Sequence, residues 1–386
     1  MGINFSRLLS LKYGNAISNY LGSKYQAISV GRVMTCVLGM VVRREREIRE
    51  FVKTPFYRVL GSFLAGGLPF DGEWRAVEGS RYFQSPYLYK ENGFKEKKHA
   101  EELKAILSAH PPYKAVVEKI EKKKENKTPP LLFNLAELQN ECSRMFKISP
   151  DETLSIVQDL YEKKLVTYPR TDARVLSTAV AKEIYKNISG LRNYPQAGEA
   201  AQGALELGAY KNIAKTRYTN DKQITDHYAI IPTGQGLGAL KGLSLTAQRV
   251  YETIVRRFLS IFYPPAVYQK VSLVTKMENE SFFSSFKVLL SEGYLKIAAN
   301  SFAKKSMAEA SGKTPESEGE GEVSCDEALL AALQKLKKGD ILNINGLGIK
   351  EGETSPPKRY NSGSMILAME NAGQLIEEED VREETV

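Results

Sequence analysis

The N-terminal part of the chain places apolar side chains three to four residues apart, which is the spacing of an α-helix. One such run covers 6–20, where Gly14 marks a break. A second run covers 29–50, where valines and Met40 form the apolar face and alternating Arg and Glu form the polar face. Opposite charges four residues apart stabilise an exposed helix. We therefore predict helices that end before Pro55, because the residue before a proline avoids the helical conformation.

After Pro55 the pattern changes to short apolar runs separated by Gly and Pro, which predicts strands over 56–94. A polar helix is expected after residue 95, followed by the basic run 121–127, Glu-Lys-Lys-Lys-Glu-Asn-Lys. This run is predicted to be a solvated surface or a linker, and a DNA-facing patch is the alternative. Strands are predicted again over 267–297 and at 341–344.

The middle of the chain carries clear signals for the starts of helices. Asn134 with Glu137 three residues later is a capping-box pattern. Residues 149–152, Ser-Pro-Asp-Glu, combine a cap, a proline at the first helical position and acidic side chains in the first turn. Further helices are predicted at 177–188, 246–262 and 364–375.

The order helical, β, helical, β, helical predicts a multidomain α+β protein in which a helical domain interrupts a β-rich domain. The expected boundaries are 1–54 (helical), 55–130 (β-rich), 131–245 (helical), 246–340 (β-rich) and 341–386 (helical). Within the fourth segment, residues 304–322 are rich in Gly, Ser, Glu and Lys, and we predict a flexible insertion there.

Composition narrows the function classes. The net charge of +8 favours binding to polyanions, and 20 tyrosines offer rings on which unpaired bases can stack. No apolar run approaches the ~20 residues of a membrane span, so no membrane association is expected. Cys36, Cys142 and Cys325 are far apart, which predicts neither a disulfide framework nor a zinc site, but free thiols in a reducing cytoplasm.

The strongest chemical signal is 165–172, Leu-Val-Thr-Tyr-Pro-Arg-Thr-Asp. A phenol has a pKa near 10, so Tyr168 needs nearby positive charge to act as a nucleophile. Arg170 supplies such a charge, and guanidinium groups bind phosphate oxygens in pairs. Thr171 or Asp172 can cap the following turn. Tyr-Pro-Arg by itself is equally typical of a surface turn, so the neighbouring motifs decide the interpretation.

Five segments together resemble, in family order, the motifs of type IA DNA topoisomerases of the topoisomerase III kind. They are 2–7, 29–33 with 43–48, 165–172, 225–234, and 356–360 with 368–373. The resemblance covers nearly the whole chain. It implies part of a toroid, with a β-rich arch interrupted by the helical domain that carries the active-site tyrosine. It also implies transient cleavage of one DNA strand through a 5′-phosphotyrosine link, strand passage and religation without ATP.

The resemblance also implies roles for individual residues. Tyr168 is the expected nucleophile, Arg170 the expected charge stabiliser, and His227 the histidine that assists phosphate contact. A histidine bonded to the backbone for structural reasons is the alternative for His227. The expected DNA contacts are Arg32, Arg7, Thr167, Asp172 and Thr233. For Arg32 the alternative is a helix-surface ion pair, and for Asp172 a role in orienting Arg170 or capping a turn.

The chain departs from the family pattern in several ways. It is expected to lack the end of the C-terminal helical domain, because it stops soon after Asn371, where the family continues. We find neither the family's Toprim domain nor its acidic cluster, so Mg²⁺ is implied but its ligands are not expected in this chain. The acidic run 377–380 is expected to be solvated, and Met34 stands where many relatives have Gln. We therefore expect an incomplete enzyme, a piece of a longer gene product or one half of a split one, that needs a Toprim domain from the same gene product or from a separate chain.

Two other interpretations can be weighed against the first. A non-catalytic remnant of the scaffold would still bind single-stranded DNA through phosphate contacts and stacking. A tyrosine recombinase would carry its tyrosine near the C-terminus, whereas Tyr168 lies mid-chain. The expected location is the bacterial cytoplasm, on the nucleoid or a plasmid.

Overall fold

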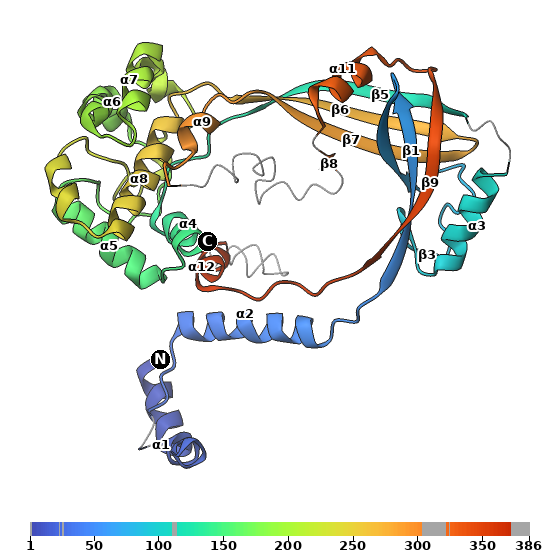
Figure 1. Ribbon diagram of the computed structural model, residues 1–386. Helices are drawn as coiled ribbons and strands as arrows, with labels where there is room; N and C mark the ends of the chain where they lie inside the picture. Colours follow the sequence, from blue (N-terminus) through green and yellow to red (C-terminus); the bar gives the residue numbers. More distant parts are fainter. Residues whose placement is uncertain are drawn as a thin grey trace. The chain divides into compact units, whose positions relative to one another are not determined.

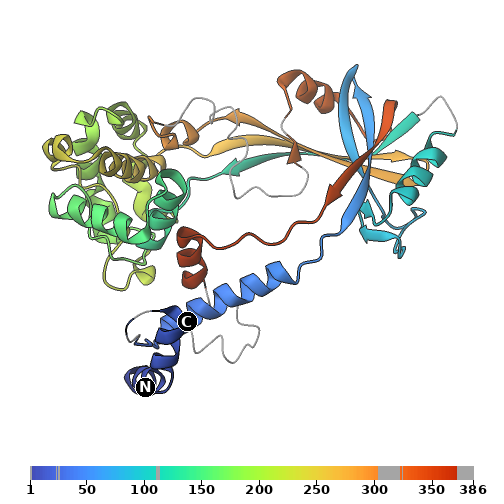
Figure 2. The same cartoon turned by 60° about the horizontal axis from the view of Figure 1, so that its bottom comes forward.

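The computed structural model describes residues 2–22, 24, 27–109, 114–302, 322–323 and 325–371. The chain divides into two compact units, and each is described by itself (Figures 1 and 2). The larger unit comprises Lys53–Leu138 and Asp151–Thr354, and the smaller comprises Met1–Val52, Gln139–Pro150 and Ser355–Val386. The predicted α+β class is confirmed, since the larger unit combines an antiparallel sheet with a helical part.

The strands of the larger unit form a closed circuit. The strands are β1 (Pro55–Ala65), β2 (Leu68–Arg75), β3 (Leu88–Lys90), β4 (Gly93–Phe94), β5 (Lys114–Lys127), β6 (Ala266–Met277), β7 (Glu280–Ser291), β8 (Glu322–Val323) and β9 (Ile341–Glu353). Pairing runs from β1 to β2, β7, β6, β5, β9 and back to β1, always antiparallel. Closure removes unpaired sheet edges. Phe63, Trp74 and Phe282 are fully buried in the associated core.

The strands β5, β6 and β7 are long and carry the chain into the helical part (Figure 1). Lys127 at the end of β5 pairs with Ala266 at the start of β6, so the polypeptide leaves the sheet and returns at the same point. This arrangement confirms that helices interrupt a β-rich region. Most of the helical part therefore occupies the sequence between these two paired residues, and residues 294–302, which follow β7, also pack against it.

The prediction of a linker for the basic run 121–127 is wrong, because the run is part of strand β5. Each residue from Glu121 to Lys127 pairs with one on β6. The charges face water while the backbone groups pair, and Glu121 binds both Lys119 and Lys123. These two cations lower the pKa of Glu121 to about 2. Charge alone indicated exposure correctly but could not reveal the backbone pairing.

The predicted helices are present within the described residues, and the predicted cap at Asn134 is formed. The helices of the larger unit are α3 (Lys97–Leu107), α4 (Leu135–Phe146, shared with the smaller unit), α5 (Pro150–Glu162), α6 (Thr178–Gly190), α7 (Gly198–Leu207), α8 (Leu245–Ser260), α9 (Leu295–Ala298) and α11 (Glu327–Lys335). The Asn134 side chain accepts a hydrogen bond from the Glu137 amide at 2.9 Å. Ser177 caps α6 in the same way through the Val180 amide.

Two predicted boundaries need correction. Helix α8, which falls in the β-rich segment predicted from residue 246, packs within the helical part: Arg257 donates to the Leu131 carbonyl, and the Tyr251 ring lies edge-on to Tyr194. Strand β9, which falls in the helical segment predicted from residue 341, pairs with β1 and β5. Pairing partners depend on tertiary contacts that the order of elements does not reveal. Of the insertion predicted at 304–322, residues 304–321 lie outside the described residues, and Glu322 begins β8.

The smaller unit contains α1 (Gly2–Leu21), α2 (Arg32–Arg49) and α12 (Ser362–Glu370). The predicted break at Gly14 is wrong, because the helix continues through it and the Ser18 hydroxyl donates to the Gly14 carbonyl. Glycine in a helix costs only about 1 kcal/mol, which flanking residues can offset. None of the described helices is long and apolar enough to cross a membrane.

Two of the family-like motifs meet within the smaller unit. The guanidinium of Arg44 on α2 donates to the Lys358 carbonyl and lies 4.2 Å from the Tyr360 ring centroid. Arg359 pairs with Glu45 through two hydrogen bonds, and this pairing lowers the pKa of the Glu45 carboxyl. The segments 43–48 and 356–360, more than 300 residues apart, are thus held together by charged and stacked side chains.

Candidate active site

The two motif segments around Tyr168 and His227 run side by side in the larger unit. Val166 and Pro232 form an isolated antiparallel bridge. The Thr167 amide donates to the Ile231 carbonyl at 3.0 Å. The Thr167 hydroxyl accepts from the Ile231 amide and donates to the Ala229 carbonyl, both at 3.0 Å. One threonine next to the tyrosine therefore joins two segments more than 60 residues apart.

Two further threonines extend this junction on either side. The Thr171 hydroxyl donates to the His227 carbonyl at 2.7 Å and accepts from the Ala173 amide at 3.1 Å. The Thr233 hydroxyl donates to the Lys164 carbonyl at 2.5 Å. Each hydroxyl thus pairs with a backbone group of the neighbouring segment or turn. The threonines thus fix where Tyr168 and His227 lie relative to each other.

The end of helix α6 packs against the segment that carries His227, where Gly190 lies close to Gly234. A Cβ atom on Gly190 would lie 2.1 Å from the Gly234 carbonyl oxygen. Gly234 itself has φ +76°, a conformation that favours glycine. The Asn187 side-chain amide donates to the Pro232 carbonyl at 2.9 Å. No side chain larger than hydrogen fits at residue 190 while the two backbones stay in this position.

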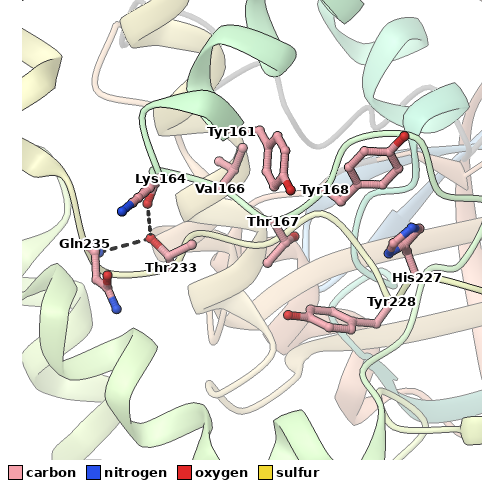
Figure 3. Close-up of a pocket in the computed structure, with 9 residues that line it drawn as sticks. All are labelled: Tyr161, Lys164, Val166, Thr167, Tyr168, His227, Tyr228, Thr233 and Gln235. Atoms are coloured by element: carbon pink, nitrogen blue, oxygen red, sulfur yellow. Dashed lines mark hydrogen bonds between the residues drawn. The ribbon is translucent and has the colours of Figure 1, made fainter.

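The ring of Tyr168 lies between two other rings (Figure 3). Tyr161 from α5 meets it edge-on, with centroids 5.5 Å apart and planes at 82°. The His227 ring is tilted against it, with centroids 4.3 Å apart. The Tyr168 hydroxyl points away from Tyr161 (Figure 3). Tyr168 is half-buried and His227 is exposed, so the ring is oriented while its surroundings remain open to a ligand.

Positive charge lies next to this tyrosine. Arg170 is exposed, and within the described residues its guanidinium has no hydrogen-bond or ion-pair partner. The Asp172 carboxylate accepts a hydrogen bond from the Thr225 hydroxyl at 3.3 Å rather than from Arg170, and its contact with DNA stays a prediction. The capping role falls to Thr171. Arg170 is therefore free to bind an anion such as a phosphate.

A pocket of about 410 Å³ opens beside the tyrosine. It is lined by Tyr161, Lys164, Val166, Thr167, Tyr168, His227, Tyr228, Thr233 and Gln235. Sequence reasoning named four of these as site residues: Thr167, Tyr168, His227 and Thr233. It missed Tyr161, Lys164 and Gln235, because none of them lies within one of the family-like motifs. Tyr228 stood within a motif, and burial raises the pKa of its phenol.

A family model described as DNA topoisomerase matches residues 1–374 of the chain. The chain belongs to the DNA topoisomerase family. It is similar to DNA topoisomerase 3 of Bacillus licheniformis, with 31% identity over 98% of this chain and 45% of the relative. DNA topoisomerase 3 of Bacillus subtilis is 30% identical over the same shares. The chain thus spans less than half the length of these curated relatives.

The fold agrees with this membership. Full-length topoisomerase I from Thermotoga maritima superposes with a TM-score of 0.58, at 23% identity, over 95% of this chain and 52% of that structure. The predicted type IA topoisomerase fold is thereby confirmed. The assembly of the two units into a toroid stays a prediction.

The two arginines predicted to bind DNA lie in the smaller unit of this topoisomerase-family chain. Arg7 is exposed on α1, and Arg32 is the first residue of α2. Nothing is described of the Arg32 side chain. The DNA contacts of both arginines stay a prediction. The hydroxyls of Thr167 and Thr233 are bonded to backbone carbonyls, and a role for them in binding DNA likewise stays a prediction.

The Mg²⁺ that the family implies finds no match in the part of the chain that the structure describes. No group of three or more His, Cys, Asp or Glu side chains there could hold a metal ion. Hard divalent cations need several oxygen ligands. We therefore assign no step of the chemistry to a metal held by these residues.

Replacing Lys164 by glycine is expected to stabilise the protein. Helix α5 ends with the Leu165 amide bonded to the Leu160 carbonyl and the Lys164 amide to the Tyr161 carbonyl, a Schellman motif. Lys164 holds the left-handed conformation at φ 61°, which favours glycine by about 1 kcal/mol. Urea unfolding followed by circular dichroism should show this gain for Lys164→Gly.

Lys163→Gly serves as the matched control, because Lys163 does not have positive φ and glycine there gains nothing. It should lower the free energy of unfolding by a few tenths of a kcal/mol to about 1 kcal/mol. If both variants lower it equally, the left-handed conformation at Lys164 is not a source of strain.

Proposed function

We propose that the chain provides the DNA-cleaving part of a type IA topoisomerase, with Tyr168 as nucleophile. The Tyr168 hydroxyl oxygen attacks a phosphorus of one strand, and the bond to the 3′-oxygen breaks. The phosphate stays on the tyrosine as a 5′-phosphotyrosine, and the 3′-oxygen leaves as a hydroxyl after gaining a proton. Because the ester conserves the bond energy, attack by that hydroxyl reseals the strand without ATP.

The observation that carries the proposal is the His227 ring against the Tyr168 phenol at the pocket. Arg170 follows two residues later, does not line the pocket and has no partner among the described residues. A cation that reaches the phosphate stabilises the charge that develops on its oxygens and on the departing phenolate during resealing. Orientation of the ring by Tyr161 and His227 lowers the entropic cost of reaching the reactive geometry.

The complete reaction cycle is proposed for a larger assembly than this chain. The acid that protonates the 3′-oxygen and the metal ion are not assigned to residues described here. We propose that a Toprim domain, on this polypeptide or on another, supplies both. Single-stranded DNA is the proposed substrate, and the bacterial relatives favour action in the cytoplasm on a chromosome or plasmid.

The test is covalent trapping with two differently labelled single strands. The chain is incubated with DNA labelled at the 3′ end or at the 5′ end, with Mg²⁺, with and without an added Toprim domain, and then denatured. A 5′-phosphotyrosine keeps the 3′-labelled piece on the protein and releases the 5′-labelled piece. We expect an adduct only with the 3′ label, and a strong increase when the Toprim domain is added.

Other results would contradict the proposal. Retention of the 5′ label would indicate the 3′-linkage of a tyrosine recombinase. DNA binding without any adduct, even with the Toprim domain, would leave the chain as a single-strand-binding remnant of the scaffold. Robust relaxation of supercoiled DNA by the chain alone would refute the need for a Toprim domain.

A further inference from the structure

Three residues that line the pocket have no part in the proposed cleavage. They are Lys164, Tyr228 and Gln235, and none of them is needed to attack or stabilise a phosphate at Tyr168. We propose that these residues, together with Tyr161, form a subsite that receives one unpaired nucleobase of the strand being cleaved. The inference rests on the proposed function, because it names a further contact made by the same substrate.

The aromatic residues supply stacking surface for a base. Tyr161 comes from α5 on one side of Thr167, and Tyr228 comes from the adjoining segment on the other (Figure 3). The Tyr161 side chain is 41% exposed, so part of its ring is available. Aromatic rings stack on any base, because every base has a π-face. The hydroxyl of the half-buried Tyr228 phenol can donate a hydrogen bond to a base.

The polar residues supply contacts that aromatic rings cannot. The Gln235 side chain is exposed, and its amide offers both donors and an acceptor, which matches the edge of a base. The Lys164 ammonium has no ion-pair partner among the described residues, so it can bind a phosphate or a base oxygen. Thr233 holds the backbone of both residues in place. Its hydroxyl donates to the Lys164 carbonyl and accepts from the backbone amide of Gln235 at 3.1 Å (Figure 3).

The size and position of the pocket also suit a base. Its volume of about 410 Å³ falls within the range of small-molecule sites. The Tyr168 hydroxyl points away from Tyr161, so a base beside the ring would not occupy the place of the phosphate (Figure 3). A base can enter such a pocket only when it is unpaired and unstacked. The subsite would thus favour single-stranded over duplex DNA at the point of cleavage.

The experiment measures how much one base contributes to binding. The full chain carrying Tyr168→Phe, which cannot cleave, is titrated with fluorescein-labelled strands of eight thymidines at low ionic strength. In a series of strands, each position in turn carries an abasic residue. Fluorescence anisotropy should show one position at which the missing base weakens binding about 10-fold, the effect of losing a stacked base.

The pocket is then altered in the same background. Adding Tyr228→Leu should reduce that abasic penalty to about 3-fold, because the base then has only the Tyr161 ring on which to stack. Gln235→Ala should reduce the abasic penalty in part. Because Gln235 is exposed, this variant should fold, and it tests the subsite even if Tyr228→Leu does not fold. The control is Tyr185→Leu: Tyr185 lies on α6, is 50% exposed and does not line the pocket, so the 10-fold penalty should remain.

The outcomes separate the subsite from the proposed function. If the intact strand binds but no abasic position matters, or if the penalty persists in both pocket variants, the subsite is refuted and the proposed function stands. If the intact strand does not bind even at low ionic strength, the subsite and the proposed function are both refuted.

Discussion

Tyr168→Phe is expected to abolish the covalent protein–DNA adduct, a loss of at least about 10³-fold, as for other removed nucleophiles. The substitution deletes only the hydroxyl oxygen that forms the ester. The ring remains, so its contacts with Tyr161 and His227 should persist. Binding of single-stranded DNA should therefore change less than 2-fold, as measured by anisotropy alongside the trapping assay with the Toprim domain present.

Three tyrosines line the pocket, so the two others serve as controls for the substitution of Tyr168. Tyr161→Phe and Tyr228→Phe each remove one hydroxyl and keep the ring, and both should retain the adduct. Tyr228 is the poorer nucleophile, since burial raises the pKa of its phenol. An adduct that survives Tyr168→Phe and disappears in either control would assign the nucleophile to a different tyrosine and contradict the proposed function.

Gly190→Ala is expected to disrupt the site without touching any reacting group. Alanine normally favours a helix over glycine by about 1 kcal/mol. Here the new methyl carbon would lie 2.1 Å from the Gly234 carbonyl oxygen, and backbone cannot rotate away as a side chain can. Overpacking of this severity costs at least about 3 kcal/mol, so the clash outweighs the helical gain. The segment that carries His227 should be displaced from Tyr168.

Hydrogen exchange followed by mass spectrometry measures this directly. The Ala229 amide bonds to the Val175 carbonyl and the Ile230 amide to the Phe133 carbonyl, so both amides should exchange slowly in the wild type and quickly in Gly190→Ala. The trapped adduct should fall in parallel.

Gly238→Ala is the matched control for this substitution, because nothing lies within 4 Å of a Cβ added at Gly238 and its φ is not positive. It should leave protection and adduct unchanged. Equal protection in Gly190→Ala and wild type would show that α6 does not support the site as closely as the structure indicates.

The chemistry of the site could be predicted from the sequence, because it depends on residue types that are adjacent in the chain. Tyr168 and Arg170 lie two residues apart, so a phenol with a neighbouring cation is evident before any folding. The motif around His227 was recognised separately. That the two segments touch depends on hydrogen bonds of Thr167 and Thr171 to residues more than 55 positions away. Such bonds leave no periodic signal in the sequence.

The sequence by itself determined the kinds of element and their caps, because apolar periodicity and capping side chains act within a few residues. It also determined the family and the candidate nucleophile. Only the tertiary structure decided that the charged run 121–127 is a paired strand, that β9 closes the sheet, and that Lys164 and Gln235 line the pocket. Each of these depends on which distant backbone a segment meets, and that choice is made by the packing of the whole larger unit rather than by any local pattern.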